Sequence, residues 1–265
     1  MMKQTTSRRM ILGLLAGVPL LALEQSPAFA RDASLIARLI REARSQPQAP
    51  VPLSQRIAFI SRSLLGARYR AHTLIGGPRR REQFVVRADA FDCVTFCEIV
   101  LATALARDFD GFEALLRKIR YVDGNVRWDA RNHYFAEWCR HAVENKICRP
   151  VTVDPAVTFK KTVNWENFGK RHVTINAVAK STLLANKHLL STGDIIGFVS
   201  RQSRLDYFHT GLIMFGKGNV LLLRHASQSR GKVLDQRMDR FLAVNRVKYV
   251  TLLRPVEQEP AARPG

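Results

Sequence analysis

The chain has 265 residues, of which 46% are hydrophobic and 24% are charged, with no collagen-like or low-complexity bias. This composition excludes a fibrous or intrinsically disordered protein, and the length suits one sizeable domain with room for an extra lobe. Four cysteines, Cys93, Cys97, Cys139 and Cys148, are too few for a disulfide scaffold and form no C-x-x-C pair. Cys139 and Cys148 could pair in an oxidising compartment, although spacing alone does not show it.

Residues 1–30 have the features of an export signal. Arg8 and Arg9 precede an apolar run that extends to Leu23, and Ala28-Phe29-Ala30 matches the small-x-small pattern of signal cleavage. The arginine pair resembles a twin-arginine signal, although Sec signals also carry paired basic residues. The apolar run is short for a membrane span, and no later segment is long enough. We therefore expect cleavage after Ala30 and a soluble periplasmic protein with no lipid anchor and no integral membrane span.

The formal net charge is +20, and it falls to +18 after cleavage because residues 1–30 contain three basic residues and one acidic residue. In a cytosolic protein this charge would indicate nucleic-acid binding. Outside the cytoplasm the available polyanions are the cell wall and anionic lipid head groups. We therefore expect no nucleic-acid partner, and the charge indicates where the protein is retained rather than which reaction it catalyses.

The first part of the mature chain is predicted to be mostly helical. Apolar periodicity predicts helices over residues 33–44, 54–65, 93–106, 112–120 and 131–145. Ser54 is expected to cap the second of these helices, and Gly66 to end it. Residues 66–90 are predicted to form a loop with one short strand at 84–86, just before the cysteine-containing helix.

The segment from Cys93 to Ala106 is apolar on nearly every side, which predicts a helix buried on all faces. Asp92 is a good N-cap, so Cys93 would lie in the first turn, where N–H groups and the helix dipole stabilise a thiolate. The charge of Asp92 opposes this effect where the carboxylate points at the sulfur, so a nucleophilic cysteine would still need a base. The alternative is a buried cysteine with a structural role.

The last third of the chain changes to the period of strands. Strands are predicted over residues 194–199, 207–215, 220–225 and 246–253. Residues 150–192 give mixed signals and are left as a possible insertion or lid, and residues 256–265 are predicted to be a flexible tail. Helices followed by strands predict an α+β fold, in which a helical lobe carrying Cys93 packs on an antiparallel sheet within a single catalytic domain, residues 31–255.

Two histidines lie in the predicted sheet. His209 begins one strand and His225 ends the next, and the turn at 216–219 makes these strands neighbours. The two imidazoles are therefore expected to face each other at one edge. Where that edge meets the start of the Cys93 helix, His209 can take the thiol proton while His225 orients it, as in cysteine hydrolases. Each histidine alone would suit a structural role, but the three groups together indicate a catalytic site.

Several short motifs occur in an order that is more specific than any one of them. They are Gly66-Ala67-Arg68-Tyr69, Asp92-Cys93-Val94-Thr95-Phe96, Tyr121-x-Asp123-Gly124, Arg131-Asn132-His133-Tyr134-Phe135-x-x-Trp138, Gly193-Asp194-Ile195-Ile196, His209-Thr210-Gly211, His225-Ala226-Ser227 and Arg254-Pro255. Over most of residues 57–255 this pattern resembles the N-acetylmuramoyl-L-alanine amidase-like family, a branch of the NlpC-type cell-wall cysteine hydrolases of papain-like fold.

The resemblance implies that Cys93 is the nucleophile, His209 the general base and His225 the third member of a triad. It also implies that Tyr69 is a pocket tyrosine whose hydroxyl, with the N–H of Cys93, stabilises an oxyanion. Such chemistry needs no cofactor and no metal. The residues expected to contact substrate are Tyr69, Asp92, Arg131 and His133. Arg131 and His133 belong to a cluster of cationic and aromatic groups that suits a sugar lactyl unit or a stem-peptide carboxylate.

Two departures from the common NlpC pattern concern specificity. That pattern has Tyr-x-x-Gly-Gly and Asp-Cys-Ser-Gly, whereas this chain has His72 and Val94-Thr95 at the corresponding places. We therefore expect a cysteine amidase acting on peptidoglycan or muropeptides, which cleaves between N-acetylmuramic acid and L-alanine through a thioester intermediate. Cleavage within the stem peptide, between D-glutamate and the diamino acid, is the alternative.

Two further hypotheses compete with this one. His133, Glu137 and His141 recur every four residues on a predicted helix, so a neighbouring pair could chelate zinc, although there is no His-Glu-x-x-His run and such a face is commonly solvated. The second is a non-catalytic basic wall-binding protein, in which Cys93 would be dispensable. The oligomeric state stays open.

Overall fold

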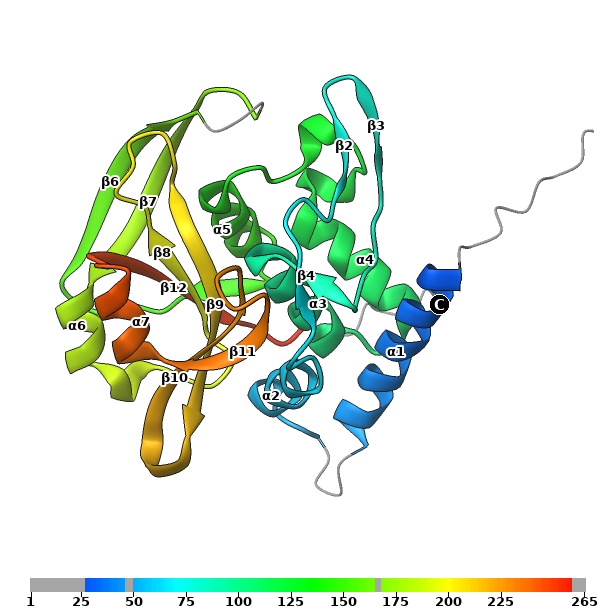
Figure 1. The fold of residues 1–265 in the computed structure, drawn as a ribbon, viewed down its shortest axis with the longest axis horizontal. Helices are drawn as coiled ribbons and strands as arrows, with labels where there is room; N and C mark the ends of the chain where they lie inside the picture. The colour runs from blue at the N-terminus through cyan, green and yellow to red at the C-terminus, as the bar shows by residue number, and fades with distance from the viewer. Residues whose placement is uncertain (1–26, 46–49, 165–167, 259–265) are drawn as a thin grey trace, which may run out of the picture.

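The computed structural model describes residues 27–45, 50–164 and 168–258. A group of helices lies on one side and a curved sheet on the other, with the chain passing from the helices to the sheet along its length (Figure 1). This order is the predicted α+β arrangement.

The elements are as follows. The helices are α1 (Pro27–Arg44), α2 (Leu53–Ser63), α3 (Cys93–Leu105), α4 (Phe109–Arg120), α5 (Phe135–Glu144), α6 (Lys180–Ala185) and α7 (Met238–Val244), with 3₁₀ turns η1 (Val122–Gly124), η2 (Trp128–Ala130), η3 (Lys187–Leu189) and η4 (Lys217–Asn219). The strands are β1 (Arg68–Tyr69), β2 (Ile75–Gly77), β3 (Arg80–Gln83), β4 (Ala90–Phe91), β5 (Cys148–Pro150), β6 (Ala156–Val163), β7 (Arg171–Ala179), β8 (Ile195–Val199), β9 (Tyr207–Gly216), β10 (Val220–Ser227), β11 (Lys232–Arg237) and β12 (Tyr249–Pro255).

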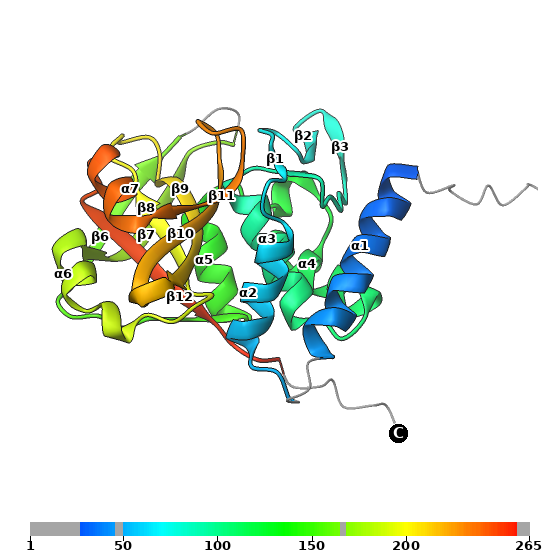
Figure 2. The same ribbon diagram turned by 60° about the horizontal axis from the view of Figure 1, so that its bottom comes forward.

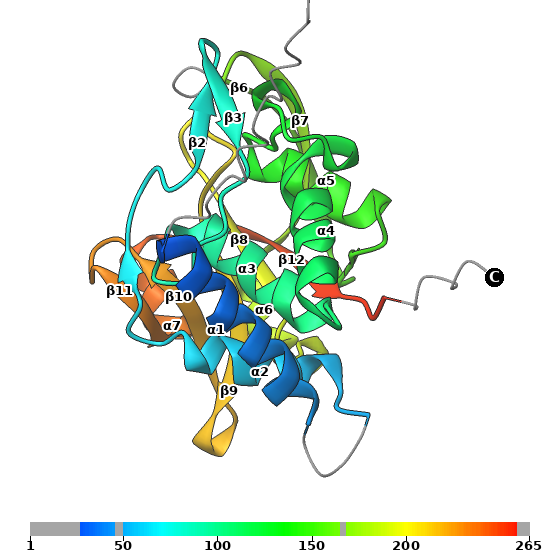
Figure 3. The same ribbon diagram turned by 90° about the vertical axis from the view of Figure 1, so that its right-hand side faces the viewer.

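The main sheet has ten strands, in the order β4-β1-β11-β10-β9-β8-β12-β7-β6, with β5 paired to β12 outside this path. Neighbours are antiparallel except β1 and β4. The predicted turn between β9 and β10 is confirmed, and Gly218 within it has φ +69°, which glycine adopts without steric cost. The hairpin of β2 and β3 is a separate two-stranded sheet that projects from the helical side (Figures 1 and 3).

Helix α3 lies at the centre of the molecule. Its residues from Thr95 to Leu105 are all buried, as the sequence predicts. It packs against α1, α2 and α4 on one side and against β9 and β10 on the other (Figure 2). Burying a large apolar side chain stabilises a protein by about 1.5–3 kcal/mol. Every face of a helix with neighbours all round is buried, so each face favours apolar residues and none is polar. A smaller apolar cluster fills the opposite face of the sheet against α6 and α7.

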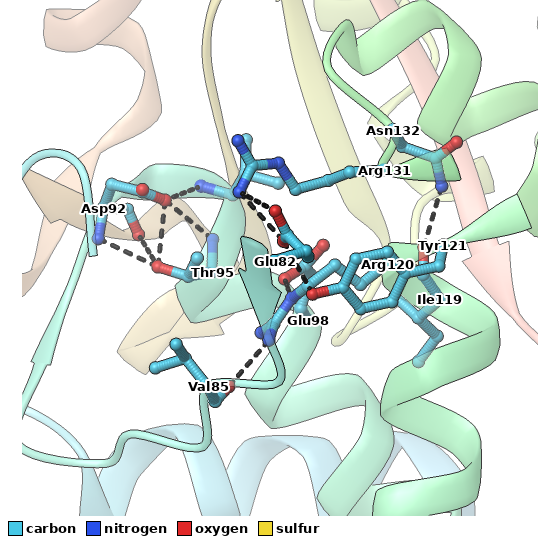
Figure 4. Close-up of polar contacts among 11 residues, drawn as sticks. Glu82, Val85, Asp92, Thr95, Glu98, Ile119, Arg120, Tyr121, Arg131 and Asn132 are labelled. Carbon is cyan, nitrogen blue, oxygen red and sulfur yellow. Dashed lines mark hydrogen bonds and ion pairs between the residues drawn. The ribbon is translucent and has the colours of Figure 1, made fainter. Parts of the chain in front are cut away.

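One ion pair is buried beside α3. Glu98 and Arg120 are 3% and 2% exposed, and Nε of Arg120 donates to Oε2 of Glu98 at 2.8 Å (Figure 4). The Nη1 atom of Arg120 also donates to the carbonyl oxygen of Val85 at 2.7 Å. Arg120 therefore ties α4 both to α3 and to the segment that leads into β4.

Two predictions in the first part of the chain are wrong. The second helix begins at Leu53 with Pro52 as its N-cap, so Ser54 lies inside the helix and does not cap it. Residues 84–86 are not a strand, and the strands between residues 66 and 91 are β1, β2, β3 and β4. The reason is side-chain contact, because the guanidinium carbon of Arg117 lies 3.9 Å from the ring centroid of Phe84 and the Val85 carbonyl accepts from Arg120.

The middle of the chain also differs from expectation. The helix predicted from residue 131 begins at Phe135, because Arg131 bridges to Tyr121 and keeps the preceding loop extended. Residues 150–192, left open as an insertion or lid, contribute β6 and β7 to the edge of the main sheet, followed by α6. Strand β11 and helix α7 are not predicted from the sequence.

The two ends of the described chain can be compared with the predicted signal cleavage point and the predicted C-terminal tail. Helix α1 begins at Pro27 and continues past Ala30, so the predicted cleavage point lies in its first turn, and the residues before 27 lie outside the described ranges. At the other end, the Val256 N–H donates to the Ile147 carbonyl at 2.9 Å, so the predicted tail is anchored at its start. Within the described ranges, no helix has both the length and the apolar character needed to cross a membrane.

Candidate active site

Asp92 and Thr95 cap the start of α3. The Asp92 Oδ1 atom accepts from the N–H groups of Val94 at 3.0 Å and Thr95 at 2.8 Å, while the Asp92 N–H donates to Thr95 Oγ1 at 3.0 Å (Figure 4). This reciprocal capping box satisfies N–H groups that a helix start leaves unpaired. Cys93 is therefore the first helical residue, as predicted. Asp92, which was expected to contact substrate, instead holds the helix start.

The surroundings of the Cys93 thiol disfavour its thiolate form. Burial raises its pKa to about 12, and the charge of Asp92 raises it further. The N–H groups of Thr210, Cys93 and Val94 lower the pKa by smaller amounts. The sequence predicts that the helix start lowers the thiol pKa. In the structure burial raises this pKa by more, because a desolvated thiolate loses its hydration. A neighbouring base is therefore required for a nucleophilic sulfur.

The two predicted strand histidines meet at the open end of β9 and β10. Nε2 of His209 and Nδ1 of His225 lie 2.7 Å apart, and the two rings are nearly perpendicular at 86°. The β9–β10 ladder runs from the turn only to the pair Leu212–Arg224, so the strands separate just where the histidines lie. A hydrogen bond between side chains thus bridges two strands that no longer share backbone bonds.

Gly211 permits this approach of the two strands. A Cβ atom at this position would lie 2.9 Å from the Arg224 carbonyl oxygen and 3.0 Å from Cβ of His225. Both distances are below ordinary van der Waals contact, so any larger residue would displace the backbone that carries His225. The His209-Thr210-Gly211 motif therefore has a steric basis in this structure.

Cys93 lies against the same strand. The N–H of Thr210, the residue after His209, donates toward the Cys93 sulfur and lowers the thiol pKa. The Thr210 side chain forms a hydrogen bond with Cys97, which lies one turn further along α3, and this bond lowers the pKa of the Cys97 thiol. The start of α3 therefore lies beside Thr210, the residue that follows His209 in β9.

Both histidines are neutral at neutral pH. Burial lowers the pKa of His209 to about 3, and the neighbouring His225 lowers it further. Burial also lowers the pKa of His225 to about 4, although Gln236 and Asp235 act in the opposite direction. Gln236 forms no hydrogen bond of ordinary geometry with this ring, and Nε2 of His225 is buried without a partner in the described chain. In the tautomer in which Nε2 of His209 donates to His225, Nδ1 of His209 is unprotonated and can accept a proton.

Tyr69 borders the sulfur from β1. Burial raises the pKa of its hydroxyl to about 12, with further contributions from the charges of Cys93 and Asp92. Within the described chain the hydroxyl makes no hydrogen bond, so it remains free to donate to another group. The predicted neighbourhood of Tyr69 and Cys93 is therefore present.

Phe241 is a site residue that the sequence does not reveal. Its ring lies 5.4 Å from the His209 ring and 5.5 Å from the His225 ring, centroid to centroid. Phe198 packs behind it at 4.6 Å. Helix α7 thus covers the histidine pair with an aromatic surface. The only sequence signal was the short apolar run within residues 238–244.

Arg131 is engaged in internal contacts. Its Nη1 atom pairs with Oε1 of Glu82 at 3.0 Å, and the Tyr121 hydroxyl donates to the same oxygen at 2.9 Å (Figure 4). Glu82 is on β3, so this group anchors the β2–β3 hairpin to the loop before α5. Arg131 therefore has a structural ion pair, and its contact with substrate stays a prediction.

His133 is likewise engaged inside the fold. Its Nε2 atom lies 2.7 Å from the Trp128 carbonyl oxygen, and its ring stacks on Phe168 with centroids 4.8 Å apart. Burial lowers the pKa of His133 to about 4. His133 therefore packs within the fold, and its contact with substrate stays a prediction.

The alternative zinc site is not formed. His133 precedes α5, Glu137 pairs with Arg171 at 3.5 Å, and Nδ1 of His141 bonds to Oδ1 of Asn132. In the part of the chain that the structure describes, no group of three His, Cys, Asp or Glu side chains is arranged to hold a metal. Cys139 and Cys148 are both buried free thiols, so the pairing considered from the sequence is not made.

Comparison with known proteins gives consistent matches. An N-acetylmuramoyl-L-alanine amidase from Bacteroides uniformis superposes with a TM-score of 0.69 at 25% identity, covering 77% of this chain and 99% of its own. A Legionella pneumophila protein of family DUF1460 superposes with a TM-score of 0.76 at 21% identity, covering 89% and 98% respectively, which shows the shared fold. Among proteins of curated function, none matches the chain.

These findings define an enzyme with a mixed α+β fold, in which helices pack on a curved sheet. Residues 59–248 match the model of the N-acetylmuramoyl-L-alanine amidase-like family, and this match spans more than half of the chain. The protein therefore belongs to the N-acetylmuramoyl-L-alanine amidase-like family.

Proposed function

We propose that this protein is a cysteine-dependent peptidoglycan amidase with an NlpC-type papain-like fold. Family membership supports the reaction class. The observation that carries the proposal is the joint placement of the 2.7 Å His209–His225 bond and the Thr210 N–H that points at the Cys93 sulfur. This arrangement has the nucleophile, base and orienting group that acyl transfer requires.

Acylation begins with proton transfer. Because Nε2 of His209 is bonded to His225, Nδ1 is the atom that takes the proton of Cys93. The thiolate then attacks the lactyl carbonyl carbon of N-acetylmuramic acid and forms a C–S bond. The negative oxygen of the tetrahedral intermediate accepts hydrogen bonds from the Tyr69 hydroxyl and the Cys93 N–H. The C–N bond breaks as His209 returns its proton to the nitrogen of L-alanine, which releases the stem peptide.

Deacylation repeats the same proton movements with water. His209 takes a proton from a water molecule, and the resulting hydroxide adds to the thioester carbonyl. The C–S bond breaks, the lactyl carboxylic acid leaves and the proton returns to Cys93. His225 accepts the Nε2–H of His209 at its Nδ1 in each half-reaction, so it fixes the tautomer that leaves Nδ1 of His209 available.

The amide between sugar and peptide is favoured over bonds within the stem peptide. His72 and Val94-Thr95 stand where the NlpC endopeptidase pattern has glycine and serine, and His72 has the positive φ of 54°. A bulkier pocket wall implies a different substrate end at the nucleophile. The export signal in residues 1–30 and the net charge of +18 after its removal fit a periplasmic enzyme that acts at the anionic wall.

Product analysis tests this function. The mature protein is incubated with a defined disaccharide-tetrapeptide, and the products are identified by mass spectrometry. An intact tetrapeptide and a free disaccharide acid are expected. A sugar that retains L-alanine and D-glutamate would replace the amidase with an endopeptidase. Binding to sacculi without any product would favour the non-catalytic wall-binding protein.

A further inference from the structure

A basic groove lies at the edge of the sheet, on strands that the site described above does not use. It is a hollow of about 490 Å³ between β6, the end of β8 and the start of β12. Its lining includes four cationic residues, namely Lys160, Lys161, Arg201 and Lys248, and no Asp or Glu. We call this feature the basic groove.

The basic groove has a fixed shape. The Lys161 ammonium donates to the carbonyl oxygens of Ser200 at 2.9 Å, Gln202 at 3.0 Å and Leu205 at 2.8 Å. These three bonds hold the loop after β8 against β6 (Figure 1). Phe159 and Tyr249 pack edge to face with ring centroids 4.7 Å apart, which gives the groove an aromatic wall.

The other three cations have no internal partner. Lys160, Arg201 and Lys248 are exposed, and within the described ranges no carboxylate pairs with any of them. By contrast, Arg224 in the hollow beside α2 pairs with Asp235 at 2.7 Å, and Arg140 beside α5 pairs with Glu144 at 3.0 Å. Uncompensated positive charge on three sides of a hollow attracts anionic groups.

The basic groove begins next to the histidine edge of the sheet. Phe198 pairs with His209 across β8 and β9, and Val199, Ser200 and Arg201 follow Phe198 directly in the groove wall. A ligand held at His209 therefore needs only a short extension to reach Arg201. An extended tetrapeptide spans up to about 13 Å, which exceeds the roughly 10 Å that the three residues from Phe198 to Arg201 can span.

We propose that the basic groove binds the free carboxylates of the peptidoglycan stem peptide. This inference rests on the proposed function, because the peptide is then the leaving group of the reaction at Cys93. Its carboxylates on D-glutamate, the diamino acid and the C-terminus meet Lys160, Arg201 and Lys248, and the alanine methyl groups meet Phe159 and Tyr249. The cations thus select an acidic peptide and direct it away from the nucleophile.

Binding to an inactive protein tests the groove separately from catalysis. Calorimetry with the Cys93→Ala protein measures the Kd of a disaccharide-tetrapeptide, and of the same compound with its carboxylates converted to amides. The triple variant Lys160→Ala, Arg201→Ala and Lys248→Ala is expected to weaken binding of the free acid about tenfold. Its binding of the amide form should not change. High salt should weaken binding of the free acid as well.

The control triple variant removes the same charge elsewhere. Lys118, Lys187 and Lys217 are exposed and lie outside the groove, so changing them to Ala should alter Kd less than about twofold. The single variant Arg201→Glu is measured as well, so that the test does not depend on correct folding of the triple variant. Circular dichroism checks that this single variant is folded. The groove assignment would be overturned by any of three results. These are an equal change in Kd for both triple variants, an equal change in Kd for the amide form, or no binding by Cys93→Ala. Binding that depends on the groove without hydrolysis by the wild-type protein would support the groove and refute the amidase.

Discussion

The Nε2 atom of His209 and the Nδ1 atom of His225 are joined by a 2.7 Å hydrogen bond across two strands that have stopped pairing through their backbones. The two side chains bridge the strands at this end, and the Cys93 helix begins beside the Thr210 N–H. The bond also determines which nitrogen of His209 can act on the thiol. Its loss should therefore affect catalysis through the tautomer of His209.

We expect the strand histidines to carry the acid–base chemistry. The variant His209→Ala should lower kcat/KM by about 10²–10⁴, the typical contribution of a general base, and His225→Ala should lower it less. The exposed His188→Ala is the control and should retain full activity. A chelator should have no effect. Activity that disappears with a chelator and returns with zinc would contradict this assignment.

The buried histidine pair should make folding stability depend on pH. In an unfolded chain histidine titrates near about 6.5, whereas burial lowers the folded pKa of His209 to about 3 and that of His225 to about 4. The unfolded chain therefore binds more protons, and the free energy of unfolding should fall as pH decreases from about 6.5 toward about 4. Urea unfolding of the double variant His209→Asn and His225→Asn should show a shallower slope, while His188→Asn keeps it. An unchanged slope in the double variant would mean that other groups cause the dependence.

Phe241 should shield the two histidine rings from water. Replacing it with leucine removes a ring that lies about 5.5 Å from both imidazoles, so water should approach and the pKa of each histidine should rise toward its ordinary value. The pKa values can be followed by NMR titration in the Cys93→Ala protein. Phe59→Leu, on α2, is the control for loss of a partly buried ring. Equal histidine pKa values in both variants would show that Phe241 is only a packing residue.

The buried Glu98–Arg120 pair should be sensitive to the removal of one partner. Glu98→Gln or Arg120→Met leaves one buried charge without its counter-charge, and each should lower the free energy of unfolding by about 3–5 kcal/mol. The double variant Glu98→Gln and Arg120→Met should lose less than the sum of the two single variants. Denaturant unfolding of all three proteins gives this coupling energy. Strict additivity would show that the two charges do not interact across α3 and α4.

The parts of the site that were predicted correctly depend on short-range signals. The cap residue Asp92 directly precedes Cys93, and one tight turn places His209 beside His225. The buried helix could also be predicted, because its lack of a polar face is visible in consecutive residues. In these cases each inference needed only one element and its neighbour.

The parts that could not be predicted depend on distant contacts. Arg131 and His133 were assigned to substrate, but Glu82 on β3 holds the first and Trp128 with Phe168 enclose the second. The thiol pKa is set by how densely other elements surround α3, which no local pattern records. Phe241 belongs to a short helix whose place over the histidines follows from the pairing of β10 with β11.

The measurement that tests the central claim most directly is the intact mass of the protein after rapid acid quenching with a disaccharide-tetrapeptide. The account predicts a covalent adduct on Cys93 with the mass of the disaccharide acyl group, release of intact tetrapeptide, and neither in Cys93→Ala. An adduct that also carries L-alanine and D-glutamate would contradict the amidase assignment. Turnover by Cys93→Ala at the wild-type rate would contradict the cysteine mechanism itself.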